Sequence, residues 1–293
     1  MTEDRIGIIG IGLLGSALAD RLIEAGHAVV GFDVDRSKCD ALKARGGAIR
    51  ESADSLIREC DSVLLSLPTS KIVSDVLRDA EKSLRPNISI IDTTTGDPEE
   101  IEDLGNRLAT LNIDYVEAKV AGSSDQTRRG DAVLLLAGNK DCVNRSQTLI
   151  DAVSPKSYYL GSVGAATRFK LVHNLVLGLH RAVLAEGLLF GQALGFDPAL
   201  TLSILEGTPA ASRVMQTKGQ KMVSRDYAPQ ATLSQHLKDV RLIVKEADRL
   251  NAATPLSILH QSLLERAQSA GYGDADNSAI VEAFADSPPQ GDS

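Results

Sequence analysis

The feature that most constrains the fold is a run of three glycines near the start of the chain. A β-rich stretch, Ile6–Ile9, passes directly into Gly10–Gly15 (Gly-Ile-Gly-Leu-Leu-Gly), and a helical pattern follows. Gly10 permits a tight turn, Gly12 lets a ligand approach the main chain, and Gly15 lets the helix pack closely on the strand. The free N–H groups at the start of such a helix attract phosphate. The segment therefore predicts a strand–turn–helix unit that binds a dinucleotide through its pyrophosphate.

The first half of the chain alternates β-rich runs with helical patterns. Strands are predicted at Ile6–Ile9, Ala28–Phe32, Ser62–Leu67, Ile88–Ile91 and Ala132–Ala137. Helices are predicted at 13–25, 36–45, 70–83, 98–110 and 139–152. This alternation indicates βαβ units and a mainly parallel, doubly wound sheet.

The β-rich pattern ends at about residue 163, and the pattern from Ala165 onwards is helical. We therefore expect an α/β Rossmann-type domain with a doubly wound parallel sheet over residues 1–163. An all-α C-terminal domain is expected over residues 164–286, with a long helix from about Ala165 as the joint. The composition of residues 287–293 is typical of a disordered tail.

The second predicted strand is followed by Asp33, which bears on the choice of cofactor. A carboxylate there accepts hydrogen bonds from a ribose 2′-hydroxyl and repels a 2′-phosphate. Arg36 lies close by and could hold such a phosphate, but Asp35 adds a second acid to the same turn. NAD is therefore favoured over NADP. The alternative for Asp33 is an ordinary turn residue.

Charge and composition argue against several classes of partner. The formal net charge is −8, with 39 acidic and 31 basic residues and no basic run, so we expect no nucleic acid and no membrane partner. Three distant cysteines fit neither a disulfide framework nor a metal site, and they suit a reducing cytosol. Five histidines in no metal-binding spacing predict no bound metal.

Targeting features are absent from the N-terminal residues, which lack the basic and apolar regions of a secretory signal, so a cytoplasmic protein is expected. The most apolar segment, 171–194, is interrupted by several polar residues. We therefore expect a long buried helix there rather than a membrane span. Its large apolar surface also predicts a homodimer or homotetramer.

Lys170 and Asn174 lie four residues apart in the predicted long helix and therefore share one face. Because this helix is apolar, an ammonium on that face requires a partner or a lowered pKa. Both conditions suit a group that exchanges a proton with a substrate oxygen. The alternative is a lysine that extends from the helix flank into water. His173 is interpreted as a core or pocket-wall residue.

Four segments, in this order, resemble the β-hydroxyacid dehydrogenase family. That family includes 3-hydroxyisobutyrate dehydrogenases, tartronate semialdehyde reductases and glyoxylate or succinic semialdehyde reductases. The segments are Gly10–Gly15, Ile91–Pro98, Gly161–Asn174 and Leu237–Val240. The resemblance extends from about residue 5 to residue 285.

The resemblance implies an enzyme that transfers a hydride between a nicotinamide cofactor and a small 3-hydroxy acid or semialdehyde. It places Lys170 on the family's catalytic lysine and Asn174 on its substrate-binding companion. The implied cofactor contacts are Gly10, Ile11, Gly12, Leu13, Leu14, Gly15, Asp33, Leu67, Pro68, Thr95 and Lys238. The implied substrate contacts are Ala121, Gly122, Ser123, Lys170, Asn174 and Lys238.

The chain departs from the family's pattern around the implied substrate site. Ala121 stands where a serine hydroxyl would hold the substrate carboxylate, and Ala231 stands where many relatives have a phenylalanine. The main-chain N–H groups of Gly122 and Ser123 could still bind an oxyanion. The pocket is therefore expected to differ in shape, and the acid group could be a sulfonate or phosphonate.

Three basic residues near this segment, Lys119, Arg128 and Arg129, could add positive charge to the substrate site or could be solvated surface charges. Two other functions are compatible with the fold. One is an imine reductase, against which the presence of Lys170 counts. The other is a non-catalytic NAD-binding scaffold.

Overall fold

The computed structural model describes residues 5–285, so the predicted tail lies outside the described residues. The chain divides into two compact units, Met1–Lys170 and Leu171–Ser293. This division lies later than the boundary expected after residue 163, because the first turns of helix α9 belong to the first unit.

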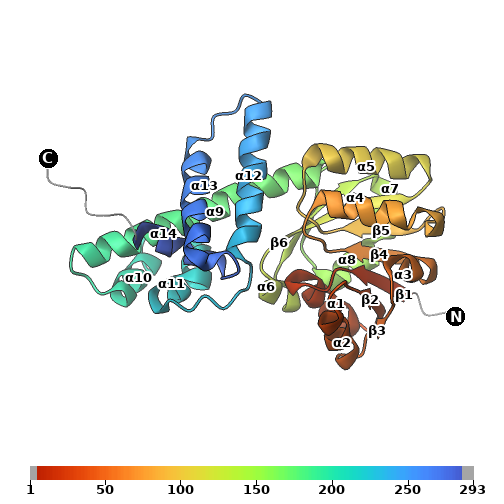
Figure 1. The fold of residues 1–293 in the computed structure, drawn as a ribbon, viewed down its shortest axis with the longest axis horizontal. Coiled ribbons are helices and arrows are strands. Elements are labelled where there is room, and N and C mark those ends of the chain that lie inside the picture. Colours follow the sequence, from red (N-terminus) through yellow and green to blue (C-terminus); the bar gives the residue numbers. More distant parts are fainter. Residues whose placement is uncertain (1–4, 286–293) are drawn as a thin grey trace. The chain divides into compact units, whose positions relative to one another are not determined.

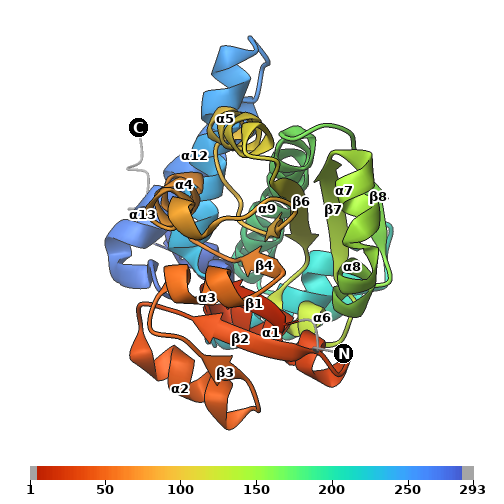
Figure 2. The ribbon, with the colours of Figure 1, turned by 90° about the vertical axis from the view of Figure 1, so that its right-hand side faces the viewer.

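The first unit contains an eight-stranded sheet in the order β3-β2-β1-β4-β5-β6-β7-β8 (Figure 2). Its strands are β1 Arg5–Ile9, β2 Ala28–Phe32, β3 Ala48–Ile49, β4 Ser62–Leu65, β5 Ser89–Asp92, β6 Asp114–Ala121, β7 Val133–Gly138 and β8 Ser157–Tyr159. Neighbours from β3 to β6 are parallel, whereas β7 is antiparallel to β6 and parallel to β8. The order reverses between β1 and β4, where sheets of this kind bind ligands beyond the carboxyl ends of the strands.

The five predicted strands are confirmed to within about two residues, but β3, β6 and β8 were not predicted. Strand β6 pairs with β5 over Asp114–Glu117 and with β7 over Val116–Ala121, although it contains Asp114, Glu117 and Lys119. Charged residues are rare in buried strands, so the sequence of this segment did not predict a strand.

Helices cover both faces of the sheet, with α4 and α5 along one side and α1 on the other (Figure 1). They are α1 Leu13–Glu24, α2 Arg36–Ala44, α3 Ala53–Glu59, α4 Ser70–Asp79, α5 Pro98–Thr110, α6 Ser124–Arg128, α7 Lys140–Arg145 and α8 Gln147–Val153. Because side chains alternate along a strand, the side chains of β1 contribute to two hydrophobic cores, one on each face of the sheet. Ile6 and Ile8 pack with α1 and α8, while Ile9 packs with α3 and α4. The doubly wound sheet is confirmed.

The second unit is helical, as predicted. Helix α9, Ala165–Ala193, begins at the predicted residue. It is followed by α10 Pro198–Glu206, α11 Gln220–Ser224, α12 Leu233–Arg249, α13 Pro255–Ala267 and α14 Glu282–Ala285. Pro198 and Pro255 are the first residues of their helices, a position where the missing N–H costs nothing.

Helix α9 is the one helix among residues 5–285 that is long and apolar enough to cross a membrane by length and composition. The core helix of a soluble protein passes the same test. The inward residues of α9 include the polar side chains of Asn174 and Arg181, both less than 9% exposed. The property is therefore weak evidence for a membrane span.

Candidate active site

The glycine segment joins β1 to α1 and leaves open space against the main chain. Gly10 has φ +90°, and a Cβ there would lie 2.3 Å from the carbonyl oxygen of Ser66. A Cβ at Gly15 would lie 1.9 Å from the carbonyl oxygen of Gly10. Gly12 has nothing within 4 Å of such an atom, and it begins α1 without a side-chain cap. The first N–H groups of α1 and the space over Gly12 therefore fit the phosphates of a dinucleotide.

Asp33 follows β2 and binds the glycine segment directly. Its Oδ2 accepts a hydrogen bond from the Ile11 N–H at 2.7 Å, and its Oδ1 accepts one from the Asp35 N–H at 2.9 Å. The Asp33 side chain is 8% exposed, and the Nζ of Lys38 lies 3.9 Å from its Oδ1. The carboxylate thus lies next to the glycine loop, where a ribose-binding residue is required.

Two more predicted cofactor loops lie at the carboxyl ends of β4 and β5. The Leu67 N–H donates to Thr94 Oγ1 at 3.0 Å, which joins the loop containing Pro68 to the loop containing Thr95. Because β1, β4 and β5 are parallel neighbours, these loops share a sheet edge with Gly10–Gly15. The first unit therefore brings the predicted cofactor residues before Lys170 to one edge.

Strand β6 ends at Ala121, and Gly122 and Ser123 lead into α6. Ser123 Oγ accepts a hydrogen bond from the Gln126 N–H at 3.2 Å, and the Ser123 N–H donates to Gln126 Oε1 at 2.9 Å. This reciprocal cap occupies the Ser123 N–H, which we expected to be available to an oxyanion. The acid-binding capacity of this turn is therefore lower than the sequence indicated.

A completely buried ionic network lies on β5 and β6. Lys119 Nζ donates to Asp92 Oδ2 at 2.8 Å and lies 3.9 Å from Glu117 Oε2, and all three side chains are fully buried. The Tyr115 hydroxyl donates to the same Asp92 oxygen at 2.8 Å. Burial and the Asp92 carboxylate raise the pKa of Tyr115 well above its usual value, so the phenol stays protonated. The expectation that Lys119 is a substrate ligand or a solvated charge is wrong, because its charge is used inside the sheet.

The two neighbouring arginines form ion pairs with nearby residues. Arg128 Nε lies 3.0 Å from Asp20 Oδ2, and Arg129 Nε lies 3.1 Å from Asp131 Oδ2. These pairs favour the surface-charge alternative for both side chains.

Glu117 also fixes the start of α9. Its carboxylate accepts hydrogen bonds from the N–H of Gly164, the N–H of Thr167 at 2.8 Å and the Thr167 hydroxyl. A carboxylate at a helix N-terminus is stabilised by the helix dipole. One turn further, Lys170 is 8% exposed, and its Nζ donates to the Val120 carbonyl oxygen at 2.6 Å. Lys170 is therefore buried at the end of β6, whereas the alternative interpretation required a solvated lysine.

Asn174 lies in the second unit, within a second polar group. Its Nδ2 donates to Asp239 Oδ2 at 2.8 Å, and its Oδ1 lies 3.0 Å from His173 Nδ1. Lys238 Nζ lies 3.0 Å from Asp239 Oδ1. Lys238 was predicted as a site residue, whereas Asp239, the next residue of the same motif, was not. Asp239 is 7% exposed. The sequence shows only a single acidic residue between apolar neighbours, which does not indicate that its side chain is buried.

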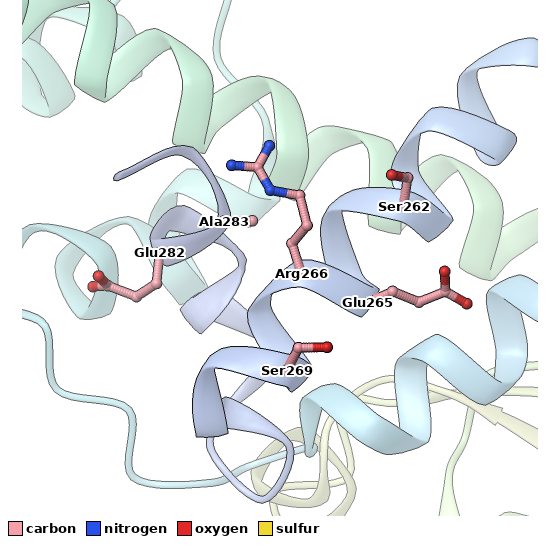
Figure 3. Close-up of a pocket in the computed structure, with 6 residues that line it drawn as sticks. All are labelled: Ser262, Glu265, Arg266, Ser269, Glu282 and Ala283. Atoms are coloured by element: carbon pink, nitrogen blue, oxygen red, sulfur yellow. The ribbon is translucent and has the colours of Figure 1, made fainter. Parts of the chain in front are cut away.

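A surface pocket of about 400 Å³ on α13 and α14 contains none of the predicted residues (Figure 3). Its two carboxylates have structural partners: Arg241 Nη2 lies 2.9 Å from Glu265 Oε1, and the Tyr227 hydroxyl donates to Glu282. This pocket is therefore not the predicted site.

Two family models match consecutive parts of the chain. The NAD binding domain of 6-phosphogluconate dehydrogenase matches residues 5–161, and the NAD-binding domain of NADP-dependent 3-hydroxyisobutyrate dehydrogenase matches residues 164–284. The chain belongs to the β-hydroxyacid dehydrogenase family. The resemblance drawn from the four segments is thereby confirmed.

Curated relatives and solved structures agree with membership of this family. The chain is 28% identical over 97% of its length to the cytokine-like nuclear factor N-PAC of Xenopus tropicalis, and it spans 54% of that protein. It is 28% identical over 95% of its length to glyoxylate/succinic semialdehyde reductase 2 of Arabidopsis thaliana, of which it covers 79%. A 3-hydroxyisobutyrate dehydrogenase from Salmonella typhimurium shares the fold with a TM-score of 0.90 and 24% identity, over 96% of this chain and 100% of that one. The chain thus spans about half the length of the N-PAC relatives.

Proposed function

We propose that this protein is an oxidoreductase that transfers a hydride between NAD and a small 3-hydroxy acid or semialdehyde. The proposal rests on one observation above all. Lys170, at the family's catalytic position, is a buried lysine whose Nζ donates to the Val120 carbonyl oxygen at the end of β6, in a unit whose glycine loop fits a dinucleotide.

Lys170 is the proton-transfer residue in this proposal. When bound, the nicotinamide supplies or accepts the hydride at its ring. Lys170 donates a proton to the substrate's carbonyl oxygen during reduction and removes the hydroxyl proton during oxidation. Asn174 orients the substrate in this proposal: its Nδ2 donates to Asp239 Oδ2 and its Oδ1 lies 3.0 Å from His173 Nδ1, so the amide is held in one orientation.

NAD is the proposed cofactor because Asp33 holds a carboxylate at the ribose position. Asp33→Ser is expected to weaken NAD binding and improve NADP binding, since the variant removes a charge that repels the 2′-phosphate. Arg36 and Lys38 lie in the first turn of α2, close to Asp33, and would assist that change. Titration of each cofactor against the wild type and the variant measures the effect.

A homodimer or homotetramer in the cytoplasm is also proposed. Apolar side chains on α9 and on the residue after it are exposed at a spacing of four and seven residues: Val172 54%, Val176 46%, Val183 68%, Phe190 65% and Leu194 60%. Such a stripe is typical of a helix that packs against another subunit. Sedimentation of the purified protein gives the oligomeric state.

The test of the reaction is nicotinamide absorbance with a panel of 3-hydroxy acids and semialdehydes, measured with NAD and NADP separately. Lys170→Ala is expected to lower kcat by about 10²- to 10⁴-fold, because general acid–base catalysis contributes that much. Lys71→Ala is the matched control, since Lys71 is an exposed lysine paired with Asp75.

Two outcomes contradict the proposal. If the Lys170→Ala variant retains full turnover, Lys170 is not the proton donor. If the wild type binds NAD but turns over no member of the panel, a non-catalytic NAD-binding scaffold is favoured.

A further inference from the structure

Strand β6 carries two buried charged residues, Glu117 and Lys119, that the proposed reaction does not use. Both side chains are fully buried, and they lie on the same face of the strand because they are two residues apart. A buried charge is unfavourable unless nearby groups compensate it. Two such residues in one strand therefore indicate a role that apolar side chains could not fill.

The Glu117 carboxylate holds the first turn of α9. Its Oε1 accepts a hydrogen bond from the Gly164 N–H. Its Oε2 accepts one from the Thr167 N–H at 2.8 Å and another from the Thr167 hydroxyl. N–H groups at the start of a helix have no partner within it, and Glu117 supplies the acceptor that they lack. The start of α9 is thus attached to β6 through one side chain.

A second contact between the same two elements involves Lys170. Thr167 and Lys170 are three residues apart and share one face of α9. Lys170 Nζ donates to the carbonyl oxygen of Val120, which lies three residues beyond Glu117 in β6. Along the helix axis, Thr167 and Lys170 are about 4.5 Å apart. The Glu117 contact therefore lies one turn before Lys170, on the helix face that meets β6.

The position of the Lys170 amino group depends on the backbone of α9. A lysine side chain has several rotatable bonds, so a single hydrogen bond at its end does not by itself fix where Nζ lies. A general acid must lie within hydrogen-bonding distance of the oxygen that it protonates. A displacement of about 1 Å can lower a reaction rate by about 100-fold. A contact that holds α9 one turn away from Lys170 is therefore relevant to proton transfer.

Lys119 compensates the charge of the Glu117 carboxylate. Its Nζ lies 3.9 Å from Glu117 Oε2 and donates to Asp92 Oδ2 at 2.8 Å. Without this cation, two buried carboxylates would remain on neighbouring strands. The other oxygen of Asp92 accepts a hydrogen bond from the Thr94 N–H at 2.8 Å. The same network thus connects the start of α9 with the predicted cofactor loop after β5.

We propose that Glu117 is a positioning residue for Lys170, and that Lys119 is the cation that allows a carboxylate to remain at this buried position. This inference rests on the proposed function, because it assigns the proton transfer to Lys170. Glu117 acts through α9 and transfers no proton itself. The contacts on which the inference depends lie within the first unit.

The experiment compares Glu117→Gln and Thr167→Val with Thr167→Ser, which keeps the hydroxyl group. Glu117→Gln is expected to lower kcat by about 10- to 100-fold, because Lys170 is displaced. Its Kd for NAD should stay within about twofold of the wild type, since the glycine loop is unchanged. Thr167→Val should lower kcat by a smaller factor, and Thr167→Ser should retain it. In a Lys170→Ala background, Glu117→Gln should lower kcat no further, because a residue that acts through Lys170 has no effect once Lys170 is removed.

Asp197→Ala is the control for a general loss of stability. Asp197 caps α10 in the second unit, where its Oδ1 accepts a hydrogen bond from the Leu200 N–H at 2.8 Å. This variant should lower the Tm, as Glu117→Gln does, but should leave kcat unchanged. Equal losses of kcat in the two variants would overturn the inference, because both would then report only the stability of the fold.

A measurement without turnover separates this inference from the proposed function. Acetic anhydride acetylates exposed lysines faster than buried ones, and Lys71 is an exposed lysine in the same unit. The ratio of acetylation at Lys170 to that at Lys71, measured by peptide mass spectrometry, therefore reports how firmly Lys170 is held. Glu117→Gln should raise this ratio several-fold, whereas Asp197→Ala should not.

The outcomes distinguish the two proposals. If the wild type is active but Glu117→Gln changes neither kcat nor the acetylation ratio, the inference is wrong and the function stands. A further loss of kcat when Glu117→Gln is added to Lys170→Ala would also overturn the inference. If no aldehyde is turned over but Glu117→Gln raises the ratio, the positioning contact stands and the proposed function fails. Should Glu117→Gln fail to fold, the contrast between Thr167→Val and Thr167→Ser decides in the same way.

Discussion

Lys119 and Arg181 are both buried cations, one in each unit, but their surroundings differ. Lys119 is fully buried at 2.8 Å from Asp92 and 3.9 Å from Glu117. Arg181 is almost as buried, yet within residues 5–285 it has no ion pair or hydrogen bond. Burial alone therefore does not distinguish a charge that is paired inside the protein from one that is not. The presence or absence of a close partner does.

The largest expected effect tests the structural half of this comparison. Lys119→Met should lower the free energy of unfolding by about 3–5 kcal/mol, because it leaves Asp92 and Glu117 buried without their cation. Urea unfolding of the wild type and the variant measures this change. Lys71→Met, which breaks an exposed pair with Asp75, should cost less than about 1 kcal/mol. Equal losses of unfolding free energy in the two variants would show that the buried pair of Lys119 contributes no more than the exposed pair of Lys71.

The next effect concerns His260, whose ring is buried beside Arg181. Its pKa is about 4 in the folded protein and 6.5 when unfolded, so the unfolded state binds the proton first as the pH falls. Stability is therefore complete above pH 6.5 and decreases by up to about 3 kcal/mol as the pH falls to 4. Unfolding curves at a series of pH values measure this loss.

His260→Gln should remove most of that pH dependence, whereas His180→Gln, at an exposed position of α9, should not. The same acid loss in both variants would show that His260 is not its source.

The smallest effect is the stability of Arg181→Met, and it is the sharpest contrast with Lys119→Met. Because Arg181 has no close partner, an apolar side chain of similar length should change the free energy of unfolding by less than about 1 kcal/mol, or raise it. A loss comparable to that of Lys119→Met would mean that Arg181 holds the buried polar groups around it together. The charge of Arg181 would then be structural, like that of Lys119.

The sequence predicted the cofactor half of the candidate site more completely than the substrate half. Gly10, Gly12 and Gly15 define a local backbone path, and their spacing between a β-rich run and a helical pattern implies a phosphate-binding turn. Strand β6 was missed because Glu117 and Lys119 are charged, and only their partners on other elements make them compatible with a buried strand. The sequence analysis also expected the Ser123 N–H to be available. It is not, because the side chain of Gln126, three residues later, accepts its hydrogen bond.

The sequence by itself determined five of the eight strands, the glycine turn, and the position of Lys170 and Asn174 on one helix face. These are properties of neighbouring residues, which local backbone preferences and side-chain periodicity fix. Only the tertiary structure decided which buried charges are paired. Asp92 and Lys119 are 27 residues apart, and Asn174 and Asp239 are 65 apart. Such contacts depend on how the elements pack, and that same packing left Arg181 without a partner.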